Sequence, residues 1–74
     1  MPNLQDNFLN QLRKEKIPVV VFLTHGVRLR GVISAFDNFV VILKEKRQQL
    51  IYKHAIATIV PDFDVRLNSN DDTG

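Results

Sequence analysis

Tyr52, Lys53 and His54 place a phenol, an ammonium and an imidazole in succession, immediately before the mostly apolar run 55–60. Aromatic rings can stack on unpaired bases, and Lys and His can donate hydrogen bonds to a base edge, a ribose or a phosphate. Phe39 follows a turn-forming Asp-Asn pair, which would present its ring at the end of a loop. Together these residues indicate contact with unpaired nucleic acid. Each alone has a simpler alternative, since an isolated Phe is usually a core residue and an isolated Lys is usually solvated.

The same residues give little support for catalysis. A catalytic site would need a nucleophile beside a base, or paired carboxylates in a cleft. Ser34 and Ser69 are the only serines, neither stands in a nucleophile motif, and the acidic residues fall mainly in turns and near the C-terminus. With two His and no Cys, a metal site is not expected either. We therefore predict no catalytic residues, metal or cofactor, and keep an enzyme as the first alternative.

Charge is distributed unevenly along the chain. Residues 1–61 hold nine Lys and Arg against four acidic residues, whereas residues 62–74 hold one Arg against four Asp. A basic body favours a polyanionic partner. The polar composition of 62–74 is typical of disorder. We therefore expect a domain over 1–61 and an acidic disordered tail over 62–74.

One helix is predicted over residues 4–16, with Leu9 and Leu12 on its apolar face. Asn3 can cap its first turn, and Pro18 disfavours helical geometry at the preceding residue, which would end the helix. Short β-rich runs separated by turn residues follow. They predict five strands, over about residues 19–23, 27–36, 39–44, 49–53 and 55–60.

The longest of these runs alternates, so that Val27, Leu29, Ile33 and Ala35 are expected on one face. Gly31 stands in its middle and permits a sharp bend. One helix and five short antiparallel strands bent at a glycine predict a mainly β fold, a small partly open barrel. Its two unpaired sheet edges favour pairing between identical subunits, and such pairing makes a ring if the rotation closes.

Chain length also favours self-association. Seventy-four residues form one small domain with a marginal core, and the absence of Cys excludes disulfides. No apolar run approaches the roughly 18 residues that a membrane span needs, and no leader-like segment is evident. We therefore expect a cytoplasmic protein without a membrane partner.

Three stretches of the chain carry recognisable motifs, and they are LQDNFLNQLRKEKIPV, FLTHGVRLRGVISAFDNFVVILK and IYKHAIATIVP. They resemble Hfq, the bacterial family of Sm-like RNA chaperones, and the match runs over residues 4–61 without an evident gap. YKHAI is a specific signature of that family, and FDNFVVIL after a glycine is similar to the first Sm motif. The resemblance implies a homohexameric ring that binds uridine-rich small regulatory RNA at a proximal pore and adenine-rich mRNA on the opposite, distal face. It also implies annealing of the two RNAs and post-transcriptional regulation.

Matching the family positions one by one implies a proximal pocket around the residues first considered. Phe39 would stack on uracil, Lys53 would donate to a uracil carbonyl or a phosphate, and His54 would donate to the ribose or phosphate of an RNA end. Tyr52 would have a structural role. The implied proximal set is Gln5, Asp6, Asn38, Phe39, Lys53 and His54.

The implied distal set is Phe22, Leu23, Gly26, Val27, Arg28, Leu29, Gln49 and Thr58. This chain departs here from the common family pattern. Phe22 replaces a common Tyr, His25 a common Asn, Arg28 a common Lys and Arg30 a common Gln. These differences leave open which adenine-rich sequence repeat this face prefers. As an alternative, the three large apolar members of the set could simply belong to the core.

The implied rim set is Asn10, Arg13, Lys14 and Lys16. Arg can grip phosphates with a planar fork that Lys lacks. The alternative is a solvated helix end, where the helix dipole favours cations. From the charges we hypothesise that Asp71 and Asp72 of the tail compete with RNA for these cations, against the alternative of an inert solubilising tail.

A second alternative for the whole protein is a structural Sm-like ring that organises other proteins without reading bases. Such a ring would have no reason to combine Phe39, Lys53 and His54 with Gln5. The resemblance also implies RNA-degradation machinery as a partner, although no residue of this chain by itself indicates that contact.

Overall fold

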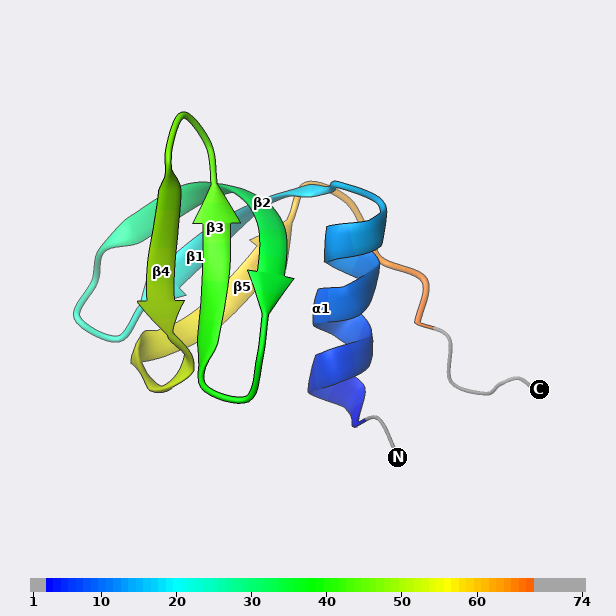
Figure 1. The fold of residues 1–74 in the computed structure, drawn as a ribbon, viewed down its shortest axis with the longest axis horizontal. Coiled ribbons are helices and arrows are strands. Elements are labelled where there is room, and N and C mark those ends of the chain that lie inside the picture. The colour runs from blue at the N-terminus through cyan, green and yellow to red at the C-terminus, as the bar shows by residue number, and fades with distance from the viewer. Residues whose placement is uncertain (1–2, 68–74) are drawn as a thin grey trace.

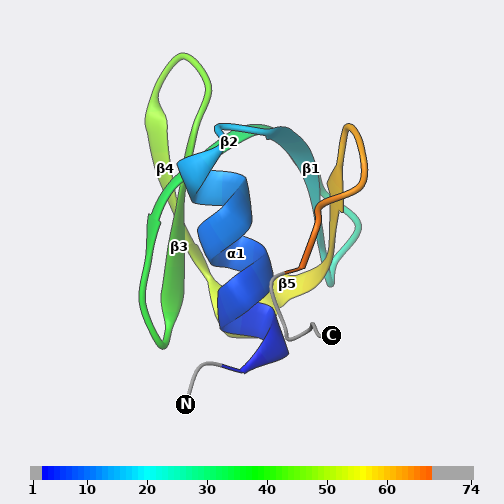
Figure 2. The same cartoon turned by 90° about the vertical axis from the view of Figure 1, so that its right-hand side faces the viewer.

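The computed structural model describes residues 3–67. In this range the elements are α1 (Leu4–Lys14), β1 (Pro18–Leu23), β2 (Arg28–Phe36), β3 (Val40–Lys44), β4 (Gln48–Tyr52), the 3-10 turn η1 (Lys53–Ala55) and β5 (Ile56–Pro61). Neighbouring strands are antiparallel, in the order β4-β3-β2-β1-β5 (Figure 1). The sheet is strongly bent, so that Figure 2 shows β3 and β4 on one side and β1 and β5 on the other. Figure 1 shows α1 beside the strands, at one end of the bent sheet. The predicted mainly β fold is confirmed.

α1 begins where the sequence predicts. The Asn3 side-chain oxygen accepts a hydrogen bond from the Asp6 amide at 2.8 Å, as an N-cap residue does. Leu9 and Leu12 are buried on one face of the helix. They join a core whose other buried residues come from the loop after α1 and from β1, β2, β3 and β4. These residues are Ile17, Val19, Val21, Ile33, Val41, Leu43 and Ile51.

The end of α1 is set by a left-handed residue rather than by Pro18 alone. Lys16 has φ 53°. The amides of Lys16 and Ile17 donate to the carbonyls of Arg13 and Leu12, which is the Schellman pattern at a helix C-terminus. The helix therefore stops at Lys14, two residues before the predicted end.

β2 does not alternate along its whole length. Its pairing with β3 shifts between Ile33 and Ala35, which leaves Ser34 as an extra residue. This bulge turns Ala35 to the exposed side, so the expectation that Ala35 shares the buried face of Ile33 is wrong. Val27 is also exposed, because it lies in the turn before β2 begins.

Glycine is required at two positions for different structural reasons. Gly26 has φ 96° in the turn between β1 and β2, a conformation that side chains disfavour. Gly31 is buried in β2, where a Cβ would lie 2.5 Å from the carbonyl oxygen of Lys44 on β3. The sequence predicted a bend at Gly31. In the structure Gly31 lets the backbone of β3 approach closely. The irregular pairing of β2 with β3 lies three residues further on, at Ser34.

Residues 62–67 continue along the body after β5. The Asp62 amide donates to a β1 carbonyl at 2.9 Å. The Gln11 side chain donates to the Arg66 carbonyl at 3.0 Å, and Val65 packs against the core. The structure therefore differs from the expected disordered tail in this part, because an apolar side chain and two hydrogen bonds hold these residues against the body.

Residues 68–74 lie outside the described residues, so the hypothesis concerning Asp71 and Asp72 stays a prediction. The division into a domain over 1–61 and a tail over 62–74 stays a prediction too. Across residues 3–67, α1 is far too short and polar to be a membrane-crossing helix, and no other helix of the required length is found.

Candidate nucleic-acid interface

Phe39 lies in the turn between β2 and β3, and 74% of its surface is exposed. The Asp37 carboxylate accepts hydrogen bonds from the amides of Phe39 at 2.7 Å and Val40 at 2.9 Å. These two bonds hold the pKa of Asp37 below its ordinary value of 3.8, and the charge of Lys53 lowers it further. The ionised carboxylate thus braces the turn that presents the exposed ring.

Lys53 is joined to the Phe39 turn through the main chain, since its amide donates to the Phe39 carbonyl at 2.8 Å. Only 15% of its side chain is exposed, and its ammonium lies 4.0 Å from a carboxylate oxygen of Asp6. The same ammonium lies 5.5 Å from the centre of the Phe36 ring. A carboxylate and an aromatic face therefore hold this cation in place. Three members of the implied proximal set come together here.

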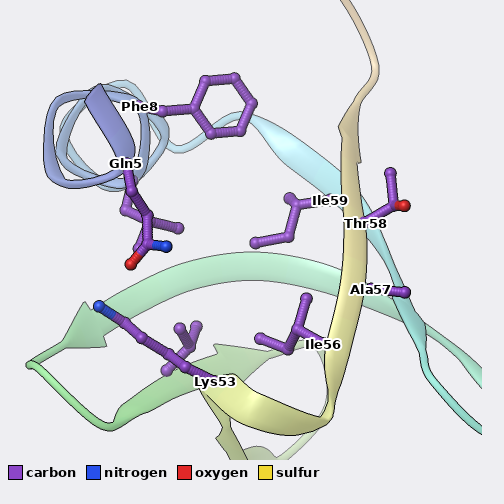
Figure 3. A pocket seen from close by; sticks show the side chains of 9 residues that line it. Gln5, Phe8, Lys53, Ile56, Ala57, Thr58 and Ile59 are labelled. Atoms are coloured by element: carbon purple, nitrogen blue, oxygen red, sulfur yellow. The ribbon is translucent and has the colours of Figure 1, made fainter. Parts of the chain in front are cut away.

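A pocket of about 220 Å³ opens beside Lys53, between α1 and β5. Figure 3 shows the Gln5 and Lys53 side chains reaching toward one another, while Phe8 and Ile59 supply apolar walls. A polar mouth over an apolar wall suits a flat heterocycle whose edge carries hydrogen-bonding groups. Gln5 is thereby placed with Lys53, as the resemblance implies.

His54 and Asn38 lie close in sequence to this site, but they are not among the residues that line the pocket in the described part of the chain. The His54 ring stacks on Tyr52, with ring centres 5.7 Å apart and planes inclined by 23°. Asn38 is exposed in the turn beside Phe39. Neither residue therefore contributes to the lining of this pocket in the single chain.

The implied distal set divides between two sides of the sheet. Phe22 pairs with Arg28 on β2 and with Thr58 on β5, so these three form a row across the outer face. Figure 3 shows Thr58 directed away from the Lys53 pocket that it borders. Leu23 and Leu29 are partly buried against the core, as the core alternative holds. The other members lie in the β1–β2 turn and on β4, and are Gly26, Val27 and Gln49.

The implied rim residues surround the end of α1. An Asn10 oxygen accepts a hydrogen bond from the Arg13 guanidinium at 2.7 Å. Arg13 and Lys16 line a second pocket, of about 490 Å³, whose other wall includes Lys44 of β3. Lys14 is exposed on the same turn of the helix but is not part of this lining.

Sequence reasoning missed two neighbours of these sites, Phe36 beside Lys53 and Lys44 beside the rim. Phe36 stands in the Sm-like motif only three residues before Phe39, so its proximity to the same loop could have been noticed. No local pattern identifies Lys44, because its position depends on how β3 folds back along β2 toward the end of α1.

A single N-terminal helix followed by a strongly bent, five-stranded antiparallel sheet defines a small Sm-like protein. The family model described as Hfq protein matches residues 4–66. RNA-binding protein Hfq of Halalkalibacterium halodurans is 56% identical over 71 residues, covering 95% of this chain and 91% of the relative. RNA-binding protein Hfq of Shouchella clausii is 60% identical over 68 residues, covering 90% and 88%. This chain belongs to the Hfq family, as its motifs indicated.

Solved structures agree with this assignment. A crystal structure of the pleiotropic translational regulator Hfq superposes with a TM-score of 0.78 at 39% identity, covering 81% of this chain and 92% of that one. The structure of an Hfq protein from Anabaena sp. gives a TM-score of 0.69 at 33% identity, covering 73% and 88%. The helix and the bent sheet are thus those of the family.

Proposed function

We propose that this chain is an RNA-binding chaperone that assembles into a homohexameric ring in the cytoplasm. Its relatives named RNA-binding protein Hfq support RNA binding. One observation carries the proposal: the exposed Phe39 ring is tied by the main chain to Lys53, whose ammonium stands at the mouth of a pocket with Gln5. An exposed aromatic ring beside a held cation suits an unpaired base.

At this proximal site a uracil stacks on Phe39 and receives hydrogen bonds from Lys53 and Gln5. Asp6 lies 4.0 Å from the Lys53 ammonium, beyond ordinary hydrogen-bond length, so the three donors of the ammonium stay available for a uracil carbonyl or a phosphate. His54 and Asn38 border the site and contact the ribose or the RNA end. Repetition of the site around a ring raises the affinity for uridine-rich RNA through multivalency.

The outer-face row of Phe22, Arg28 and Thr58 is the centre of our proposed site for adenine-rich mRNA. The rim cations, which are Arg13, Lys14 and Lys16 with Asn10, contact phosphates of both strands and reduce the repulsion between them. This would promote annealing of a small regulatory RNA to its mRNA. RNA-degradation machinery stays a proposed partner on family grounds alone.

Titration of fluorescent oligo(U) and oligo(A) RNA tests the proposal. Phe39→Ala and Lys53→Ala should each weaken oligo(U) binding, the former by about 1–3 kcal/mol for each lost stack, because one removes the stacking surface and the other a donor. Oligo(A) binding should change little. The matched control, Phe22→Ala, should show the reverse preference.

Sedimentation of each variant should show the same assembly as the parent, so that a loss of affinity is not a loss of the ring. Binding of neither oligomer by the parent would reject the proposal and favour the ring that only organises proteins. The prediction that the chain is not an enzyme is confirmed by its membership of a family whose curated members are named as RNA-binding proteins.

A further inference from the structure

An ion pair crosses the outer face of the sheet. One guanidinium nitrogen of Arg30 lies 3.1 Å and 3.4 Å from the two carboxylate oxygens of Asp62, and the two side chains are 54% and 38% exposed. Arg30 is on β2 and Asp62 follows β5, so the guanidinium reaches across β1. Asp62 is fixed in place, because its amide donates to the Pro18 carbonyl at 2.9 Å.

Strand register places this pair one step from the Phe22 row. Arg30 pairs with Val20, just as Arg28 pairs with Phe22, and the register between them is unbroken. Residues two apart on a strand lie on one face and are separated by about 6.8 Å. The outer face therefore presents an aromatic residue on β1 and two arginines along the neighbouring strand β2, one directly opposite Phe22 and one diagonal to it. Single-stranded nucleic acid fits such a surface, since its bases stack on the ring while its backbone follows the cations.

Asp62 and an RNA phosphate would compete for the same group. A phosphodiester offers a guanidinium two acceptor oxygens, as a carboxylate does. Ion pairs as exposed as this one are weak, so a phosphate can replace the carboxylate. The displaced carboxylate then remains close to the phosphate and repels it.

We infer that Arg30 is a phosphate-binding residue of the outer face and that Asp62 is an internal competitor that occupies it when no RNA is bound. An RNA strand with a base on Phe22 and phosphates on Arg28 and Arg30 displaces Asp62. The returning carboxylate favours release of the strand. This inference rests on the function proposed for the outer face. It leaves the Lys53 pocket unaffected, because the Thr58 end of the row is directed away from that pocket (Figure 3).

The test uses the full chain with fluorescein-labelled oligo(A) and oligo(U) at several salt concentrations. Asp62→Asn should tighten oligo(A) binding about two- to fivefold, the range open to an exposed ion pair, and should slow dissociation, with oligo(U) unchanged. Arg30→Gln should weaken oligo(A) binding and reduce the slope of log affinity against log salt by about 0.7, the contribution of one phosphate contact on a single strand. The double variant with Arg30→Gln and Asp62→Asn should bind oligo(A) with the same affinity as Arg30→Gln alone, because the Asp62 carboxylate has no guanidinium to occupy once Arg30 is replaced.

Asp64→Asn is the matched control, since it removes the same charge two residues along the same exposed segment. It should leave oligo(A) affinity close to that of the parent. Equal gains from Asp62→Asn and Asp64→Asn, or a gain that persists in the double variant, would show a general charge effect and overturn the inference while the proposed function stood. Failure of the parent to bind oligo(A) would overturn both. Asp62→Ser provides a second removal of the carboxylate if thermal unfolding shows that the Asn variant is not folded.

Discussion

At the scale of single residues, the candidate uracil site consists of residues proposed to contact RNA and of residues that hold those in place. Asp37 supports Phe39 through two amide hydrogen bonds, and Asp6 with Phe36 positions Lys53. The supporting groups are two carboxylates and an aromatic face, so positioning depends on charge. The site should therefore respond to acid even though its proposed contacts, a stacked ring and an ammonium, do not titrate at low pH.

Acid should weaken the Phe39 turn. Because the folded-state pKa of Asp37 is lowered by its bonds to Phe39 and Val40, its contribution to stability is complete above the ordinary value of 3.8. It is lost as the pH falls through the lower folded-state pKa. Asp37→Asn keeps an acceptor but cannot ionise. Thermal unfolding between about pH 2 and 6 should therefore show a smaller loss of stability for Asp37→Asn than for the parent, and parallel curves would contradict the assignment.

At the scale of elements, two backbone features set the geometry of the candidate sites. The left-handed Lys16 ends α1 and places a cation beside the second pocket. The close approach at Gly31 brings β3, and with it Lys44, alongside β2. Lys16 adopts a backbone conformation that favours glycine, and we propose that its charge serves the candidate rim site.

The conformation of Lys16 gives a stability prediction. Lys16→Gly should be more stable than Lys16→Ala by about 1 kcal/mol, because both remove the cation but only glycine removes the cost of the left-handed conformation. Urea unfolding at a fixed protein concentration measures the difference. Both variants should lose the same amount of RNA annealing activity, because both lack the cation. Equal stabilities of the two variants would show that the left-handed φ at this position carries no energetic cost.

Gly31→Ala should destabilise the protein by about 1–3 kcal/mol, as overpacking does, since the added methyl meets the Lys44 backbone rather than a movable side chain. Gly26→Ala is the comparison: a Cβ there meets open space, so only the positive φ acts against it, at about 1 kcal/mol. Thermal unfolding of both variants separates crowding from backbone strain. A Gly31→Ala protein as stable as the parent would mean that the two strands can move apart.

Sequence predicts best what local patterns determine. Asn3 and the spacing of Leu9 and Leu12 were sufficient for the start and the buried face of α1, and the YKHAI motif was sufficient for the family. The bulge at Ser34 was not predictable, because an extra residue in one strand becomes visible only when its partner is known. The same holds for the Lys53 surroundings, where the residues in contact come from α1, β2 and η1.

At the scale of the whole molecule, the described sheet has two open edges. β4 and β5 stand at the ends of the strand order, and Leu50 and Tyr52 on β4 are 55% and 56% exposed. Val60 on β5 is exposed as well. Unpaired backbone groups beside apolar side chains favour pairing with another chain. This supports the proposed ring, in which β4 of one subunit would pair with β5 of the next.

A charge on the β4 edge should weaken assembly. Leu50→Lys places a cation among the exposed apolar side chains, and edge lysines oppose strand pairing. Sedimentation velocity at micromolar concentration should show the parent as a multimer and Leu50→Lys shifted toward monomer, with its circular dichroism unchanged. Ala35→Lys adds the same charge on a central strand and should assemble like the parent. A parent that sediments as a monomer would reject the ring.

The hydrogen bond from the Lys53 amide to the Phe39 carbonyl involves no side-chain atoms. Substitutions at either position, except proline at 53, therefore change what the surface recognises and keep the hydrogen bond that holds the two turns adjacent. A single substitution can thus change the base preference of this protein and leave its fold unaltered. Libraries of variants at positions 39 and 53 should contain mostly folded proteins with altered base preference.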